Sequence, residues 1–122
     1  MPRVKKDDVR ENRIEMEVVV DAYGEVERAM GWHCYLGDKL TFPFRARCFA
    51  RRATSPLRIG DEVQVAGMAS EEECEHEMLV KIRWQRKSLA VPLSQLEVAG
   101  ADEQTREAVE GWHYWVKRGY EF

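Results

Sequence analysis

The chain has 122 residues, of which 44% are hydrophobic and 34% are charged, and its formal net charge is −3. This composition is typical of one globular domain, expected to span residues 1–122 and to bury a core without a metal or disulfides. It excludes a disordered or fibrous chain, and no stretch is apolar enough to cross a bilayer. Three cysteines without a framework spacing, and an N-terminus without an apolar signal region, favour a reducing cytoplasmic setting.

Residues 10–40 are predicted to form a helical hairpin that follows nine polar, flexible residues. The apolar run after Glu11 fits an alternating strand or a broadly apolar helix, and its length favours a helix from about Asp7 to Ala22. After a glycine, a second helix is predicted from Glu25 to Leu36. Gly37 is then expected at the C′ position that ends this helix.

From Phe44 the hydrophobic period changes to two, which predicts short antiparallel strands. We expect an SH3-like barrel over residues 41–97, with Pro92 on an edge strand. The predicted strands cover 44–50, 62–66, 78–84 and 88–93.

Near the C-terminus the hydrophobic pattern changes from the period of a strand back to that of a helix. Residues 94–97 are predicted to form a short helical turn and 98–101 a link, and Asp102 is expected to cap a helix from Glu103 to Lys117. The predicted fold class is therefore α+β, with a helical hairpin, a small barrel and a C-terminal helix.

The stretch from Gly67 to Glu77 is strongly acidic and contains no Lys or Arg, and it lies between two predicted strands. Its five carboxylates are those of Glu71, Glu72, Glu73, Glu75 and Glu77. Close like charges repel by about 1 kcal/mol per pair even in water, and a divalent cation relieves this repulsion. The alternative is a solvated loop whose helical turn is capped by Ser70 and Glu73. The residues alone favour this alternative, because charge runs are usually solvated surface.

A basic stretch from Phe44 to Arg58 holds five arginines and no acid. It supports a second hypothesis, an SH3-like interaction module that binds protein or nucleic acid through Arg45–Arg58. Few aromatic residues interleave with these arginines, and the nearby acids would repel a polyanion. Nucleic acid is therefore not expected as a partner.

Other metal sites and catalytic motifs have weaker support. There is no EF-hand pattern, nucleophile elbow, phosphate-binding glycine loop or His-Glu-x-x-His motif, so we expect no enzyme. Cysteine and histidine are close together at Cys74 and His76 but lack a zinc-finger spacing, which makes a zinc-dependent hydrolase a remote alternative. On a continuous helix Glu17, Asp21 and Glu25 would form an acidic row, for which a solvated face is the preferred interpretation.

Four segments together resemble the CcbP-type calcium-binding proteins, small cytosolic proteins of cyanobacteria and other bacteria. These segments are Glu11–Tyr23, Phe42–Phe44, Pro92–Glu97 and Trp112–Val116. The resemblance runs from about Asp8 to Phe122. It implies an α+β fold and a protein that binds calcium through clustered surface carboxylates, without an EF-hand, for signalling or buffering rather than catalysis.

With this resemblance, the acidic loop is interpreted as a calcium site. The predicted ligands are Asp38, Glu71, Glu72, Glu73 and Glu75, and Asp38 is expected to follow the end of the second helix. Gly37 and Gly111 stand where the resemblance would place an acid. The expected partner is the calcium ion, with no membrane contact and with a protein partner of unknown identity left open.

Overall fold

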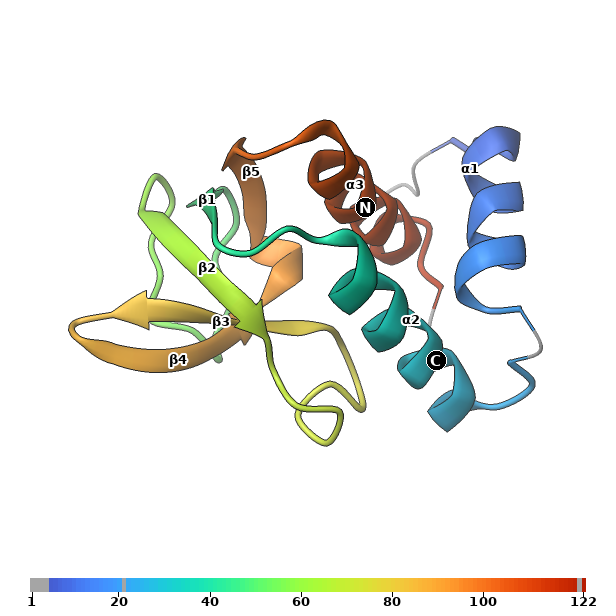
Figure 1. Ribbon diagram of the computed structural model, residues 1–122, viewed down its shortest axis with the longest axis horizontal. Coiled ribbons are helices and arrows are strands. Elements are labelled where there is room, and N and C mark those ends of the chain that lie inside the picture. The colour runs from blue at the N-terminus through green and yellow to red at the C-terminus, as the bar shows by residue number, and fades with distance from the viewer. Residues whose placement is uncertain (1–4, 21, 121) are drawn as a thin grey trace.

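The computed structural model describes residues 5–20, 22–120 and 122, and Figure 1 shows their arrangement. The helical elements in this part of the chain are α1 (Asp8–Arg13), η1 (Ile14–Val18, a π-helical turn), α2 (Glu25–Lys39), η2 (Leu93–Gln95, a 3₁₀ turn) and α3 (Glu103–Lys117). The strands are β1 (Phe44–Cys48), β2 (Glu62–Met68), β3 (Leu79–Trp84), β4 (Lys87–Pro92) and β5 (Leu96–Gly100). The α+β class is thus confirmed. Among the described helices none is long and apolar enough to span a membrane.

The strands form one antiparallel sheet, which is packed against α2 and α3, with α1 beyond these two helices (Figure 1). Over the described residues the sheet has five strands in the order β4-β3-β2-β1-β5. The SH3-like barrel is not confirmed, because the sheet is open. The chain leaves β4 through η2 and reaches the far side of β1, so β4 and β5 form opposite edges.

Strand β5 corrects the predicted link at residues 98–101. Leu96 pairs with Cys48, and Val98 pairs with Ala46, so the segment extends the sheet beside β1. The helical turn predicted at 94–97 lies earlier, in η2. Strand β5 depends on pairing with residues some 50 positions away, and its own sequence carries little strand signal.

The helical N-terminal region differs from one continuous helix at residues 7–22. Asp7 caps α1 by accepting a hydrogen bond from the Arg10 amide at 3.1 Å, and the helix widens into η1 before it stops. A Cβ atom on Gly31 of α2 would lie only 2.3 Å from the Val18 carbonyl oxygen. Glycine at this position therefore allows η1 and α2 to pack in direct backbone contact.

Helix α2 also extends further than predicted. It runs through Gly37 to Lys39, and the Leu40 amide still donates to the Leu36 carbonyl at 2.9 Å. Leu36 and Leu40 are both buried, so packing of the last turn outweighs the low helix propensity of an exposed glycine. The predicted helix end at Gly37 is wrong.

The core lies between the inner face of the sheet and helices α2 and α3. At its centre Trp32 is fully buried, with its ring centroid 5.0 Å from that of Trp112 and 5.6 Å from that of Trp115. The predicted cap of α3 is confirmed, since the Asp102 side chain accepts from the Thr105 amide at 2.7 Å. These contacts hold α2 in a fixed position relative to the sheet and its loops.

Candidate cation site

The acidic loop between β2 and β3 is closed at its base by buried groups. The Ala69 amide donates to the Leu79 carbonyl at 3.0 Å, and the Leu79 amide donates to the Cys74 sulfur at 3.3 Å. Cys74 is only 1% exposed, and burial raises the pKa of its thiol. A neutral, buried Cys74 thus fixes the middle of the loop and leaves its carboxylates on the surface.

Two of the five loop carboxylates have partners. The Glu73 amide donates to the Ser70 hydroxyl at 3.2 Å, and the Glu73 carboxylate accepts from the Ser70 amide at 3.3 Å, so the predicted capping box is present. Glu77 forms an ion pair with Arg52 at 2.6 Å. The capped turn and the excess of negative charge therefore coexist in the same loop.

The remaining loop carboxylates face solvent beside the first half of α2. They belong to Glu71, Glu72 and Glu75, which are exposed and form no ion pair with any described residue. The loop and the helix enclose a cavity of about 270 Å³, here called the acidic groove. It is lined by Glu25, Val26, Ala29, Met30, His33, Glu71, Glu72, Glu75 and His76.

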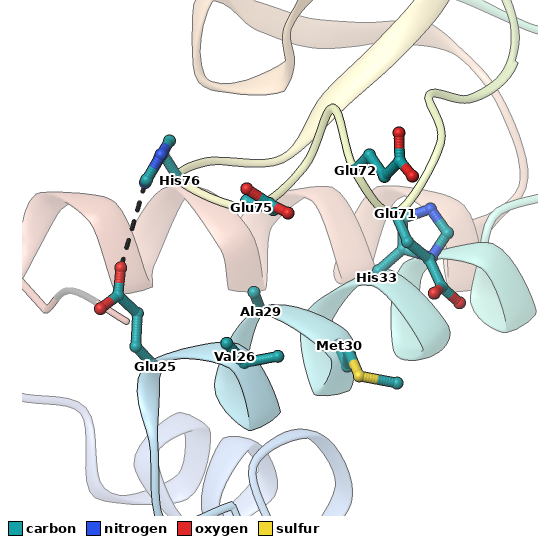
Figure 2. Close-up of a pocket in the computed structure, with 9 residues that line it drawn as sticks. All are labelled: Glu25, Val26, Ala29, Met30, His33, Glu71, Glu72, Glu75 and His76. Carbon is teal, nitrogen blue, oxygen red and sulfur yellow. Dashed lines mark ion pairs between the residues drawn. The ribbon is translucent and has the colours of Figure 1, made fainter.

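Figure 2 shows how these side chains lie. Glu75 is above Ala29, Glu71 lies beside His33, and the Glu72 carboxylate points away from the helix. His33 ties the helix to the loop, because its Nε2–H donates to the Ala69 carbonyl at 2.8 Å. At the other end of the groove His76 is 4.0 Å from Glu25.

Asp38 lies apart from this loop. It is exposed in the last turn of α2, which corrects the expectation that it follows the helix end. It lines a second hollow, here called the Asp38 groove, whose other residues are Glu17, Val18, Gly31, Cys34, Tyr35 and Lys39. Helical spacing explains the separation, since Val26, Ala29, Met30 and His33 lie on one face of α2 and Gly31, Cys34, Tyr35 and Asp38 on another.

The chemistry of the exposed donors fits a hard cation. Carboxylate oxygens are the ligands that calcium prefers, and its coordination tolerates irregular geometry. Within residues 5–20, 22–120 and 122, no three His, Cys, Asp or Glu side chains already converge as a metal cluster. An ion would therefore have to gather exposed side chains around itself. Asp21, the middle member of the predicted acidic row, lies outside the described residues.

The other constellations do not assemble. The predicted acidic row needs one continuous helix, whereas Glu17 lies in η1 and Glu25 begins α2. The basic stretch is also divided, because Arg45 is exposed on β1 whereas Arg52 turns to Glu77 and Ser94. Arg52 therefore does not belong to the exposed set of arginines, and the acidic row does not form.

These features define a class: an α+β protein whose exposed carboxylates, on a loop and on α2, suit a hard cation. The match to family models agrees, since residues 12–116 match the CcbP calcium-binding family, described as calcium binding. The chain belongs to this family. The family is defined by calcium binding and not by a reaction.

Solved structures give the same result. The chain is 39% identical to CcbP from Anabaena, whose crystal structure matches with a TM-score of 0.88, and each chain is covered completely. A second structure, of a calcium-binding protein in its calcium-binding form, is 38% identical and matches with a TM-score of 0.84, again over the whole of both chains. A comparison with curated proteins finds no match.

Sequence reasoning named Glu25 as part of an acidic row but did not place the first half of α2 beside the acidic loop. Glu25 and His33 become neighbours of the loop only through packing of α2 against the sheet, which the sequence does not specify. One signal was available, because Val26, Ala29, Met30 and His33 have the i, i+3, i+4, i+7 spacing of one helix face.

Proposed function

We propose that this protein is a non-enzymatic calcium-binding protein, a buffer or a sensor, that holds the ion through surface carboxylates. Membership of the CcbP family supports calcium as the ion. The observation that carries the site assignment is a set of three loop carboxylates that form no ion pair with any described residue, those of Glu71, Glu72 and Glu75.

The acidic groove is the first proposed calcium site. Its three unpaired loop carboxylates and Glu25 can supply several of the six to eight oxygens that calcium takes, and water and backbone carbonyls can supply the rest. Glu73 has a smaller role in this proposal because its carboxylate caps the turn. Magnesium requires a stricter octahedron, which an exposed loop provides less readily.

The Asp38 groove is proposed as a separate calcium site. Asp38 lies at the C-terminal end of α2, where the partial negative charge of unsatisfied carbonyls favours a cation. Glu17 brings a second carboxylate from η1 to the same hollow, and Lys39 brings an opposing positive charge. One ion bridging Asp38 to the loop is not proposed, because the two sets line different grooves.

The nucleophilic side chains support a role without catalysis. Cys34 is exposed on α2, and no histidine is among the described residues that line the Asp38 groove with it. By contrast, Cys48 and Cys74 are buried, and His113, whose pKa is lowered by burial, donates Nε2–H to the Leu96 carbonyl at 2.6 Å. These groups pack the core or join elements of the fold.

Titration calorimetry with calcium tests the proposal and separates the two grooves. We expect Asp38→Asn, and separately Glu71→Gln with Glu75→Gln, each to weaken binding at its own site at least about tenfold, or about 1.4 kcal/mol. Glu103→Gln, at an exposed carboxylate on α3, is the matched control and should bind like the parent. The assignment is wrong if both variants bind calcium as the parent does.

A further inference from the structure

The floor of the acidic groove is apolar, although its rim is acidic. Val26 is 70% exposed and Met30 is 46% exposed, and both lie on α2 beside the loop carboxylates (Figure 2). Calcium is coordinated by oxygen atoms, so calcium binding does not explain this apolar surface. An apolar surface in a hollow with a polar rim is one form that docking sites take.

We propose that the acidic groove docks a basic segment of a partner protein, and that calcium competes with this segment. The proposal rests on the proposed function for its calcium part only. A Lys or Arg side chain has the matching chemistry, an aliphatic stem that can lie on Val26 and Met30 and a charged end that can reach the rim. A cavity of about 270 Å³ accepts one or two such side chains and not a whole helix.

Charge complementarity favours this occupant over an acidic or neutral one. The rim carries Glu25, Glu71, Glu72 and Glu75, and no Lys or Arg is among the residues that line the groove. Met30 adds an adaptable side chain that can adjust to stems of different shape. An approaching basic segment is also attracted over a distance of roughly one Debye length, about 8–10 Å.

Competition follows from shared carboxylates. A calcium ion held by Glu71 and Glu75 neutralises the charge that attracts the basic segment and occupies its acceptor oxygens. By linkage, the bound segment must weaken calcium binding by the same factor by which bound calcium weakens binding of the segment. The protein would then release its partner when calcium rises, so the same groove acts as a sensor.

Fluorescence anisotropy with a labelled peptide of alternating Leu and Lys pairs tests the docking. In EDTA we expect the full-length protein to bind this peptide, and to bind a Leu/Glu peptide of the same pattern at least about tenfold more weakly. Val26→Ser with Met30→Ser should weaken Leu/Lys binding at least about tenfold. Met16→Ser, at a position 63% exposed outside the groove, should leave it unchanged.

Calcium then tests the competition. Adding calcium should weaken peptide binding at least about tenfold, whereas sodium chloride at the same ionic strength should have a smaller effect. The Val26→Ser, Met30→Ser variant should keep its calcium affinity, which also reports that it is folded; if it unfolds, Met30→Gln replaces it. Docking is overturned if the floor variant binds the Leu/Lys peptide like the parent. Competition is overturned if calorimetry shows that calcium still binds but the affinity for the peptide does not change. Calcium binding by the protein is a separate outcome, which is overturned if calorimetry detects no binding.

Discussion

The acidic groove and the basic side of the sheet carry opposite charges that the fold holds in different ways. The basic sheet face, defined by the exposed side chains of Arg45, Arg47, Lys81 and Arg83, lies on β1 and β3, which flank β2. Arg47 pairs across the strands with two acidic residues, Glu62 of β2 and Glu97 of β5. Strands lie about 4.8 Å apart and the register fixes which side chains are neighbours, so these cations form a spread array. The loop carboxylates of the acidic groove instead lie on a short capped turn between two strands.

This difference shows why an excess of charge alone does not predict a function. Carboxylates on one short loop can turn towards one small ion, whereas these cations start from two strands that β2 separates. None of the four cations on the basic sheet face has an ion-pair partner among the described residues, and neither do Glu71, Glu72 and Glu75. The backbone that carries the charges decides whether they can gather.

The largest expected effect comes from neutralising one region at a time. Glu71→Gln, Glu72→Gln and Glu75→Gln together should lower calcium affinity at least about a hundredfold, or about 2.7 kcal/mol, because they remove the proposed ligands of the acidic groove. Lys81→Gln with Arg83→Gln should change it less than about threefold, since only long-range charge is altered. Calcium titration calorimetry measures both affinities. A change of equal size in the two variants would show that net charge, and not the position of the carboxylates, sets the calcium affinity.

A smaller effect is expected from the backbone contact that supports α2. Gly31→Ala should lower the free energy of unfolding by about 1–3 kcal/mol, because the added Cβ meets the Val18 carbonyl oxygen. Gly37→Ala is the matched control on the same helix. No atom of the described residues lies within 4 Å of a Cβ added there, so alanine should stabilise the protein by about 0.5–1 kcal/mol. Urea unfolding measures both, and the same sign for the two would contradict the close contact.

The capped turn of the acidic loop should have a measurable effect on calcium. Ser70→Ala removes the two hydrogen bonds of the Ser70 hydroxyl with Glu73. Losing such a cap costs about 1 kcal/mol, which corresponds to about a fivefold loss of calcium affinity if the ion needs the turn. Hydrogen exchange of the Cys74 amide, which donates to the Ser70 carbonyl, should accelerate in parallel. Ser88→Ala, at an exposed position of β4, should leave both measurements unchanged. Faster exchange without a change in affinity would show that the ion does not need the turn.

The smallest expected effect is the pH dependence of stability that arises from His113, which joins α3 to β5. Burial lowers the pKa of His113, opposed by its hydrogen bond to the Leu96 carbonyl, while Lys117 lowers the pKa further and Glu97 raises it. As the pH falls, His113 is protonated first in the unfolded chain, near pH 6.5. The contribution of His113 to stability is therefore full above that pH and falls below it, by at most about 1.4 kcal/mol per pH unit. The fall ends below the folded-state pKa. Urea unfolding across this range should show a weaker fall for His113→Gln, whose amide can still donate to Leu96.

Local patterns in the sequence were enough to predict several elements. The period of two located β1 to β4 within a few residues, and the Asp102 cap located α3. The capping box of Ser70 and Glu73 was also visible, because its spacing is local. These elements are set by residues that are neighbours in the chain.

Features that depend on distant residues could not be predicted in the same way. Strand β5 exists because it pairs with β1, and α2 continues past Gly37 because Leu36 and Leu40 are buried against the core. The separation of Asp38 from the loop follows from that longer helix and from the face on which each residue lies. Carboxylate content could be predicted from the sequence, but the division of the carboxylates between two grooves could not.

Three consecutive residues of α2 connect the acidic loop and η1 to a cluster of tryptophans, whose fluorescence can be measured. Gly31 meets η1, Trp32 lies against Trp112 and Trp115, and His33 donates to the base of the acidic loop. His33, which contacts the loop, is thus next in the chain to Trp32 of a cluster of indole rings, and the emission of such rings depends on their packing. We therefore expect a movement of the loop to change this emission. The remaining tryptophan, Trp84, lies half-buried on β3 away from this cluster. In a Trp84→Phe variant, intrinsic tryptophan fluorescence would therefore detect changes in the packing of α2 against α3 without any added dye.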